Sequence, residues 1–180
     1  MSDQSISIVP RQSFYLNNKN KAKEILYWLV SLDIVKPILT NCILGLGTGY
    51  AISKGAKDVV KDSSKLPYKF IANGLELVTS SQVFDTGQYD IVDLVCPNCN
   101  EHVSGEVLSF IENWYENLCI DPICPFCFLA ADINKYTFIP RWGFSDLGFK
   151  FWNWPDFTDQ FTIELEHKLH CEVSVVHQLL

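Results

Sequence analysis

Two cysteine pairs, Cys96-Pro97-Asn98-Cys99 and Cys124-Pro125-Phe126-Cys127, lie in the stretch from Val95 to Leu129 around which the chain is organised. The 24 residues between Cys99 and Cys124 allow the pairs to meet, so that four thiolates surround one tetrahedral ion. Zinc suits four soft sulfur ligands and has no redox chemistry of its own. Proline at the second position stiffens each turn in the same place. The spacing therefore predicts a structural zinc site with Cys96, Cys99, Cys124 and Cys127 as its ligands.

Other uses of paired cysteines fit the sequence less well. A thioredoxin-like redox pair normally opens a helix directly after a strand, whereas the residues after Cys127 show no amphipathic helical pattern. A disulfide framework needs an exported context, and Met1 to Gln12 lacks the basic start and apolar run of a signal peptide. Four protein thiolates leave no position for water, which argues against a catalytic metal. The zinc-deaminase pattern fails too, because His102 is followed by Val103 and Ser104.

Composition indicates one globular core, or a small domain with an inserted module. The chain has 180 residues, 48% of them hydrophobic, and a net charge of −7 that makes nucleic acid a poor default partner. Seven cysteines, four in metal-like spacing, favour the reducing cytoplasm, with Cys42, Cys119 and Cys171 as core residues. The 17 uncharged residues between Lys36 and Lys54 are too few and too broken by glycine to cross a membrane.

Periodicity predicts a repeated order of elements on either side of the cysteine-rich stretch. On the N-terminal side, a strand over 5–9 precedes a helix that ends near Leu32 and a second strand over 74–79. The apolar stripe of that helix consists of Ala22, Ile25, Leu26, Leu29 and Val30. On the C-terminal side, a strand over 149–154 precedes a helix with Phe157, Phe161, Leu165 and Leu169 on one face, and then a last strand over 171–175. Between the cysteine pairs, helical spacing relates Val107, Phe110, Ile111, Trp114 and Leu118.

This order predicts an α+β fold. Two strand–helix–strand units combine into a four-stranded antiparallel sheet backed by two helices, the ferredoxin-like arrangement, interrupted by a zinc-ribbon-like module. We expect residues 1–92 to form the first half of the α+β domain, 93–140 the zinc-binding insertion and 141–180 the second half. Residues 38–67 resist assignment. Their segment Gly45-Leu46-Gly47-Thr48-Gly49-Tyr50 is interpreted as a glycine-rich turn, because it lacks the Gly-Lys-Ser/Thr ending of a phosphate loop and the last glycine of a dinucleotide fingerprint.

Several short motifs resemble those of a group of short, uncharacterised bacterial proteins. These motifs are Val9-Pro10-Arg11, Asn73-Gly74-Leu75-Glu76, the two Cys-Pro-x-Cys knuckles and the Phe-x-Phe-Trp-Asn-Trp-Pro run from Phe149 to Pro155. Some members of that group carry the label of a sugar-transporter ATPase. The present sequence has no Walker A lysine and is too short for a full ATPase domain, which argues against that label. The resemblance implies no catalytic residues.

The favoured function is that of a non-enzymatic bacterial protein-interaction protein, of adaptor or immunity type, with another protein as its partner. An acidic surface suits a basic partner, and a closed metal site supplies rigidity without chemistry. Side chains of the aromatic band are candidate interface anchors if one side of the band is exposed. The members of the band are Trp142, Phe144, Phe149, Phe151, Trp152 and Trp154.

Two alternatives stay open. A small enzyme of unknown reaction would use Glu101 with His102, or His167 and His170 near Glu166, although a solvated turn and a helix C-terminus explain these residues as well. A zinc ribbon that binds nucleic acid is the second alternative. Acidic residues surround the cysteines, and no lysine or arginine occurs from 95 to 134, which makes nucleic acid an unlikely partner.

Overall fold

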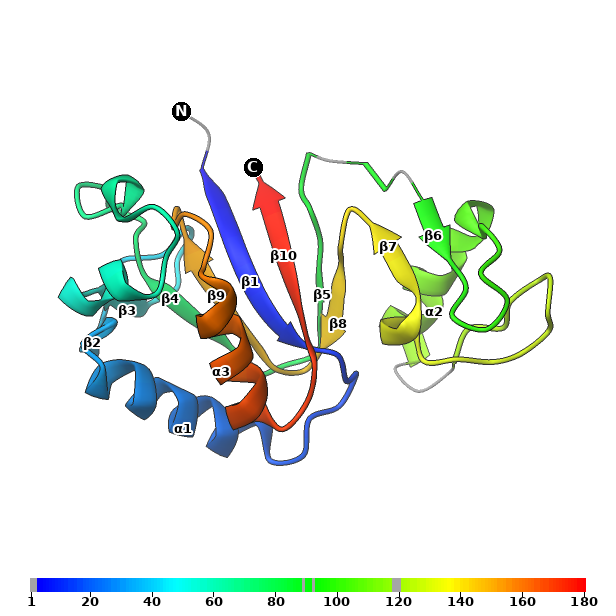
Figure 1. Cartoon of the computed structure of the whole chain (residues 1–180), viewed down its shortest axis with the longest axis horizontal. Coiled ribbons are helices and arrows are strands. Elements are labelled where there is room, and N and C mark those ends of the chain that lie inside the picture. Colours follow the sequence, from blue (N-terminus) through cyan, green and yellow to red (C-terminus); the bar gives the residue numbers. More distant parts are fainter. Residues whose placement is uncertain (1–2, 89, 92, 118–120) are drawn as a thin grey trace.

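The computed structural model describes residues 3–88, 90–91, 93–117 and 121–180, and its body is a mixed α+β fold (Figure 1). The body contains a six-stranded antiparallel sheet with the strand order β10-β1-β9-β4-β3-β2. These strands are β1 (Gln4–Pro10), β2 (Val35–Thr40), β3 (Gly49–Ile52), β4 (Leu75–Val78), β9 (Gly148–Trp152) and β10 (Val173–Leu179). The helices of the body are α1 (Asn18–Ser31) and α3 (Asp159–Leu169).

Both helices of the body pack on the same face of the sheet. The buried side chains of α1 share one core with those of α3 and with the inward side chains of β1 and β9. The contributions are Ala22, Ile25, Leu26 and Leu29 from α1, Phe161, Leu165 and Leu169 from α3, Ile6 and Ile8 from β1, and Phe149 and Phe151 from β9. The apolar stripes that the sequence predicts for the two helices are therefore the stripes that they bury, with Val30 of α1 only half-buried.

Four neighbouring strands, β10-β1-β9-β4, come from the two predicted strand–helix–strand segments. The prediction of a four-stranded sheet was nevertheless incomplete, because β2 and β3 extend the sheet to six strands. Residues 35–52 gave no alternating pattern, because Pro37 and several glycines interrupt them and because only Val35 of β2 is buried. Glycine occurs here partly because backbone approaches closely: a side chain at Gly49 would meet the carbonyl oxygen of Leu75 at 2.6 Å.

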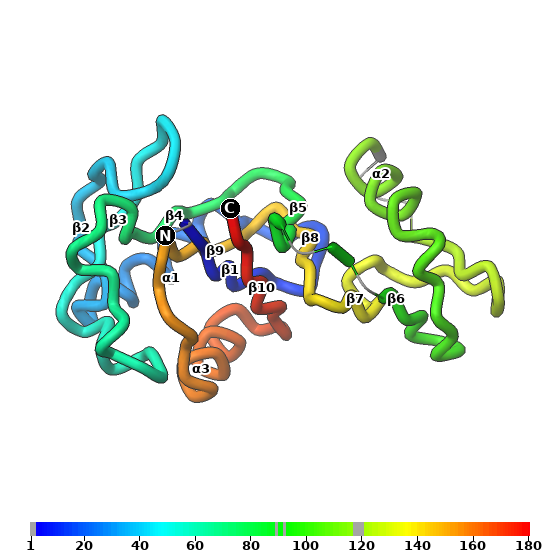
Figure 2. Tube along the Cα trace, turned by 90° about the horizontal axis from the view of Figure 1, so that it is seen from above, coloured from blue at the N-terminus to red at the C-terminus, as the bar shows by residue number. Residues whose placement is uncertain are grey.

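A smaller unit projects from the body (Figure 2). It contains β6 (Asp93–Val95), which pairs with β7 (Thr137–Ile139), and α2 (Val107–Asn117). Another two-stranded sheet, of β5 (Gln82–Phe84) and β8 (Gly143–Ser145), lies where the chain passes between this unit and the body. Short 3-10 helices cover Lys54–Asp58, Ser63–Lys65, Ser104–Glu106 and Ile133–Lys135. We call residues 93–140 the cysteine module.

The cysteine module has a hydrophobic core of its own. Val107, Phe110 and Trp114 of α2 are buried there, as their spacing predicts, whereas the predicted contact of Leu118 falls outside the described residues. Phe144 belongs to the same core although it lies in β8, beyond residue 140. Trp114 and Phe144 meet edge-on, with their ring centroids 5.5 Å apart. The module therefore packs around a core distinct from that beneath α1 and α3.

Polar contacts fix the module to the segment that follows β1. The Nε and Nη2 atoms of Arg11 donate to the carbonyl oxygen of Asn134 at 3.0 and 2.7 Å, and its Nη1 atom pairs with Glu172 at 2.8 Å. The indole of Trp114 donates to Ser13 Oγ at 2.8 Å. Arg11 thus connects β1, the start of β10 and the cysteine module through a single guanidinium group.

Candidate metal centre

The first knuckle begins at the end of β6. The Cys96 amide donates to the Glu101 carbonyl oxygen at 3.0 Å, and the Asn100 amide donates back to the Cys96 carbonyl oxygen at 3.1 Å. The Asn98 amide lies 3.4 Å from Cys96 Sγ, a geometry that favours a negatively charged sulfur. Asn100 closes the turn in the left-handed region, with φ 61°. The backbone therefore aims Cys96 and Cys99 to the same side.

The second knuckle repeats this arrangement contact by contact. The Cys124 amide donates to the Leu129 carbonyl oxygen at 3.1 Å, and the Phe128 amide donates to the Cys124 carbonyl oxygen at 2.9 Å. The Phe126 amide lies 3.4 Å from Cys124 Sγ. Phe128, like Asn100, is left-handed, with φ 59°. Two copies of one turn thus present two sulfurs each.

The four sulfurs form one compact group. All four Sγ atoms lie within 4.8 Å of one another, with 3.9 Å between Cys96 and Cys127 and 3.7 Å between Cys99 and Cys124. Zinc–sulfur bonds of about 2.3 Å in a tetrahedron place the sulfurs roughly 3.8 Å apart, so the two measured separations fit a bound ion. Disulfide sulfurs lie only about 2.05 Å apart, and all four cysteines are free. The residues that the spacing predicted to meet do meet, and they can hold a metal.

The surroundings of the sulfurs suit a structural metal site rather than a catalytic one. Cys96 and Cys124 are buried, Cys99 and Cys127 are half-buried, and the phenol of Tyr136 is buried beside them and donates to the Pro122 carbonyl oxygen at 3.4 Å. Burial, and then the nearby cysteine sulfurs, raise the pKa of Tyr136 and keep it neutral. Four thiolates complete a tetrahedral shell and leave no position for a reacting water.

The charge on one sulfur of the group strongly affects the ionisation of the others. Burial opposes the charge on Cys96, yet the amides of Cys99 and Asn98 hold its pKa at about 7. The Glu101 amide favours a charged Cys99, but burial and the neighbouring sulfurs raise the pKa of Cys99 to about 12. Without a cation, one thiolate therefore disfavours the next. A dication would remove this repulsion, which is the electrostatic reason for such a site to bind one.

The other predicted site residues do not join the cysteines. In the part of the chain that the structure describes, no further group of three or more His, Cys, Asp or Glu side chains has the geometry to hold a metal. His102 Nδ1 is hydrogen-bonded to Asp93 Oδ2, and Asp93 Oδ1 accepts from Ser104 Oγ at 2.7 Å. The carboxylate therefore lies between the serine and the histidine. In a catalytic triad the histidine contacts the hydroxyl directly and activates it, so this order does not activate Ser104. Glu101 is exposed in the turn after the first knuckle.

His167 and His170 lie at the C-terminal end of α3, where His170 is the left-handed capping residue with φ 53°. This is the position that helix capping predicts for them. Glu166 accepts from the Val173 amide at 3.0 Å and so connects α3 to β10. In the glycine-rich segment, Gly49 and Tyr50 begin β3, so the segment leads into a strand and not into a helix with a phosphate at its N-terminus.

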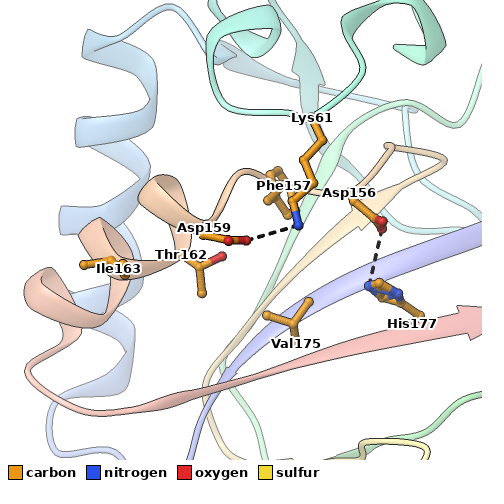
Figure 3. Close-up of a pocket in the computed structure, with 8 residues that line it drawn as sticks. All are labelled: Lys61, Asp156, Phe157, Asp159, Thr162, Ile163, Val175 and His177. Atoms are coloured by element: carbon orange, nitrogen blue, oxygen red, sulfur yellow. Dashed lines mark ion pairs between the residues drawn. The ribbon is translucent and has the colours of Figure 1, made fainter.

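A polar hollow of about 500 Å³ lies between the start of α3 and β10 (Figure 3). Lys61 Nζ pairs with Asp159 Oδ1 at 3.1 Å, and His177 Nε2 lies 3.6 Å from Asp156 Oδ1. Lys61 and His177 thus each face a carboxylate of their own. The hydroxyl of Thr162 donates to the Thr158 carbonyl oxygen at 3.4 Å and does not face either pair as a nucleophile. Each basic side chain already has a carboxylate partner, and we assign no chemistry to this hollow.

The sequence left open whether one side of the aromatic band is exposed, and the structure shows that the band is covered. Phe144, Phe149, Phe151, Trp152 and Trp154 are all buried. Trp142 is half-buried, stacks on Phe138 with a centroid separation of 6.2 Å and donates to Thr86 Oγ1 at 3.1 Å. Alternation placed these rings on both faces of β9, and the protein covers both faces. The band therefore serves the cores.

The exposed apolar surface lies elsewhere, on the second knuckle. We call Ile123, Phe126, Phe128 and Leu129 the knuckle tip. Each of these side chains is more than half exposed, and Phe128 reaches 76%. Sequence reasoning missed this surface, although large apolar residues within and just after a tight Cys-Pro-x-Cys turn are a visible signal. A turn of seven residues that directs its two cysteines inward leaves its other large side chains exposed.

The remaining cysteines behave in part as predicted. Cys42 is buried in a small cluster with Ile43, Ala72 and Trp152, whereas Cys171 is only half-buried. Cys119 falls outside the described residues. No helix in the described ranges has both the length and the hydropathy to cross a membrane. Comparisons with protein-family models, with curated proteins and with solved structures gave no match.

Proposed function

We propose that the chain is a non-enzymatic protein-interaction protein, of adaptor or immunity type, that contacts its partner through the knuckle tip. The observation that carries this proposal is the exposure of Phe126 and Phe128 on a turn whose geometry is fixed by four clustered sulfurs. Exposed aromatic side chains on a rigid support are typical anchors of protein interfaces, because little conformational entropy is lost when they are buried. A contiguous exposed apolar patch generally marks a binding surface.

Zinc is the metal that we propose for the cysteine module, as a structural ion. Four thiolates near 3.8 Å separation and a closed shell favour zinc over harder ions, which prefer oxygen ligands. Cys96, Cys99, Cys124 and Cys127 would hold it. The role of the ion is to join the two knuckles, so that the tip is presented in one conformation. Under this proposal the module is a zinc ribbon with a helix between its knuckles.

Charge supports a basic partner. The cysteine module carries seven acidic residues against one lysine, a net charge of −6. Apolar anchors that are surrounded by acidic residues are complementary to an apolar site with a cationic rim. Such complementarity speeds association and disfavours acidic partners. The same charge argues against nucleic acid as the partner. Thiols that must stay reduced to bind metal suit the cytoplasm, where we place the protein.

The body then serves as the support of the module. We propose to group the body with ferredoxin-like folds, on the strength of the strand order β10-β1-β9-β4 and of two helices on one face. The resemblance to short bacterial proteins with two Cys-Pro-x-Cys knuckles is compatible with this reading and belongs to the same proposal. A fold of this kind does not itself imply a function, so the functional proposal rests on the knuckle tip.

Affinity capture tests the proposal. The reduced full-length chain, immobilised through its N-terminus, would be compared with a Phe126→Ser/Phe128→Ser variant and with Tyr27→Ser as a control. Tyr27 is 70% exposed on α1, so its substitution removes an exposed aromatic ring of the body. We expect the partner to be lost with the tip variant and retained with the control. Equal capture by all three proteins would contradict the proposal.

A further inference from the structure

A second exposed apolar region lies on the body, between the loops that flank β3 and β4. A hollow of about 550 Å³, the size of ordinary ligand pockets, is lined there mainly by Ile43, Leu44, Phe70, Ile71 and Ala72. The carboxylate of Asp3 also lines it and accepts from Asn153 Nδ2 at 2.9 Å. A neighbouring hollow of about 670 Å³ shares Phe70 and Asn153 with it and is lined also by Lys65 and Lys69. We call the two together the lysine-flanked groove. It combines an apolar floor with cationic groups along one side.

Much of this groove is formed by a chain segment whose net charge is opposite to that of the cysteine module. Residues 36–69 contain six lysines and two aspartates, a net charge of +4 in a chain whose total charge is −7. Lys65 pairs with Asp62 at 3.3 Å, and both side chains stay accessible, while Lys69 makes no ion pair with any described residue. A solvated lysine face would not by itself imply a partner. Lys65 and Lys69 line a hollow that adjoins the apolar one and shares Phe70 with it, an arrangement that a solvated face does not need.

The two surfaces lie at opposite ends of the molecule. In Figure 1, with the longest axis horizontal, β2, β3 and the short helices that carry the lysines are at one end, and β6, β7 and α2 of the cysteine module are at the other. The knuckle tip cannot reach the groove of its own chain. One chain nevertheless carries both an acidic apolar projection and a basic apolar groove.

We propose that the knuckle tip of one copy docks into the lysine-flanked groove of a second copy, head to tail. This inference rests on the proposed function of the tip and names its partner as the chain itself. The two surfaces are complementary in two ways: both are apolar, and the module has a net charge of −6 while the segment that forms much of the groove has a net charge of +4. Because the two patches differ, each copy added leaves one free tip and one free groove, so assembly continues unless a ring closes.

Self-association of the reduced, zinc-loaded full-length chain tests this inference by sedimentation velocity over a wide concentration range. We expect the mean mass to rise with concentration, and to rise less at high salt, because the charges at the contact are solvent-exposed. The groove variant Lys65→Glu/Lys69→Glu and the tip variant Phe126→Ser/Phe128→Ser should each weaken association about tenfold or more. Tyr27→Ser on α1 should leave it unchanged.

A mixing experiment separates this geometry from other modes of association. The tip variant keeps an intact groove and the groove variant keeps an intact tip, so an equimolar mixture should form a one-to-one dimer and nothing larger. A tip-to-tip dimer would instead still form when the groove variant is studied without the tip variant, and that result would overturn the inference. A chain that stays monomeric at every concentration would overturn it as well. If such a monomer still captured another protein through Phe126 and Phe128, the proposed function would stand without this partner.

Discussion

Asn100 and Phe128 occupy the same place in the two knuckles, one residue after the second cysteine of each pair. Both are in the left-handed region, with φ values of 61° and 59°. Asparagine enters this region routinely, whereas a bulky side chain does so at a cost of roughly 1–2 kcal/mol. Phe128 is also 76% exposed, so packing does not repay that cost within the chain. The knuckle turn, which the Phe128 amide closes on the Cys124 carbonyl oxygen at 2.9 Å, therefore imposes this conformation on a side chain that the chain leaves exposed.

Replacing Phe128 by asparagine should separate stability from binding. The variant copies the residue of the first knuckle, and we expect it to raise the free energy of unfolding by about 1 kcal/mol, because asparagine relieves the left-handed strain. The same change should weaken association through the tip. Chemical denaturation of the zinc-loaded protein measures the first effect and sedimentation the second.

Phe126→Asn is the matched control for that substitution. Phe126 belongs to the same tip and is 57% exposed, but its backbone is not in the left-handed region. It should weaken association without stabilising the chain. Equal stability changes in the two variants would show that strain at Phe128 is not the cause.

Loss of a cysteine of the cluster should remove the metal and unfold the module while the body stays folded. We expect Cys124→Ser to bind less than stoichiometric zinc, because metal binding and folding are coupled when ligands come from two distant segments. Amide exchange should then become fast in α2 and stay slow in β1 and β9, because the two regions have separate cores. Cys171→Ser, at a half-buried cysteine outside the cluster, should keep one zinc. Full metal content in Cys124→Ser would be incompatible with a four-thiolate site.

Zinc binding should release protons, and acid should reverse it. At pH 7.5 Cys99, with a pKa raised to about 12, and Cys127, with a pKa also raised, are protonated in the absence of metal. Both protons must leave when the thiolates bind the ion, so affinity falls as pH falls. A pH indicator in weak buffer should report at least two protons per zinc. Zinc uptake with no release of protons would argue against thiolate ligands.

Arg11 should control how firmly the cysteine module is held to the body. Arg11→Ala removes two hydrogen bonds to the Asn134 carbonyl oxygen and the ion pair with Glu172, and we expect a loss of about 1–3 kcal/mol. Glu172→Gln removes only the pair with an exposed carboxylate, which should cost at most about 1 kcal/mol. Both variants should keep their zinc. Equal losses in the two would assign the effect to the ion pair and not to the Asn134 contact.

The sequence predicted the features that depend on local patterns of residues. The cysteine spacing led to the cluster because two rigid turns need only one chain reversal to meet, and the stripes of α1 and α3 follow from helical periodicity alone. Strands β2 and β3 were missed because β2 buries only Val35 and so shows no alternation. The exposure of the aromatic band stayed undecided because alternation along β9 cannot tell whether the second face of a sheet is covered. The knuckle tip could be found only from the exposed fraction of each side chain, which sequence periodicity does not give.

The most direct test of a zinc-held module is X-ray absorption at the zinc edge on the reduced, purified chain, together with its metal content. The account predicts one zinc per chain with four sulfur ligands at about 2.3 Å. A first shell containing oxygen or nitrogen, or a chain that folds fully without stoichiometric metal, would contradict it.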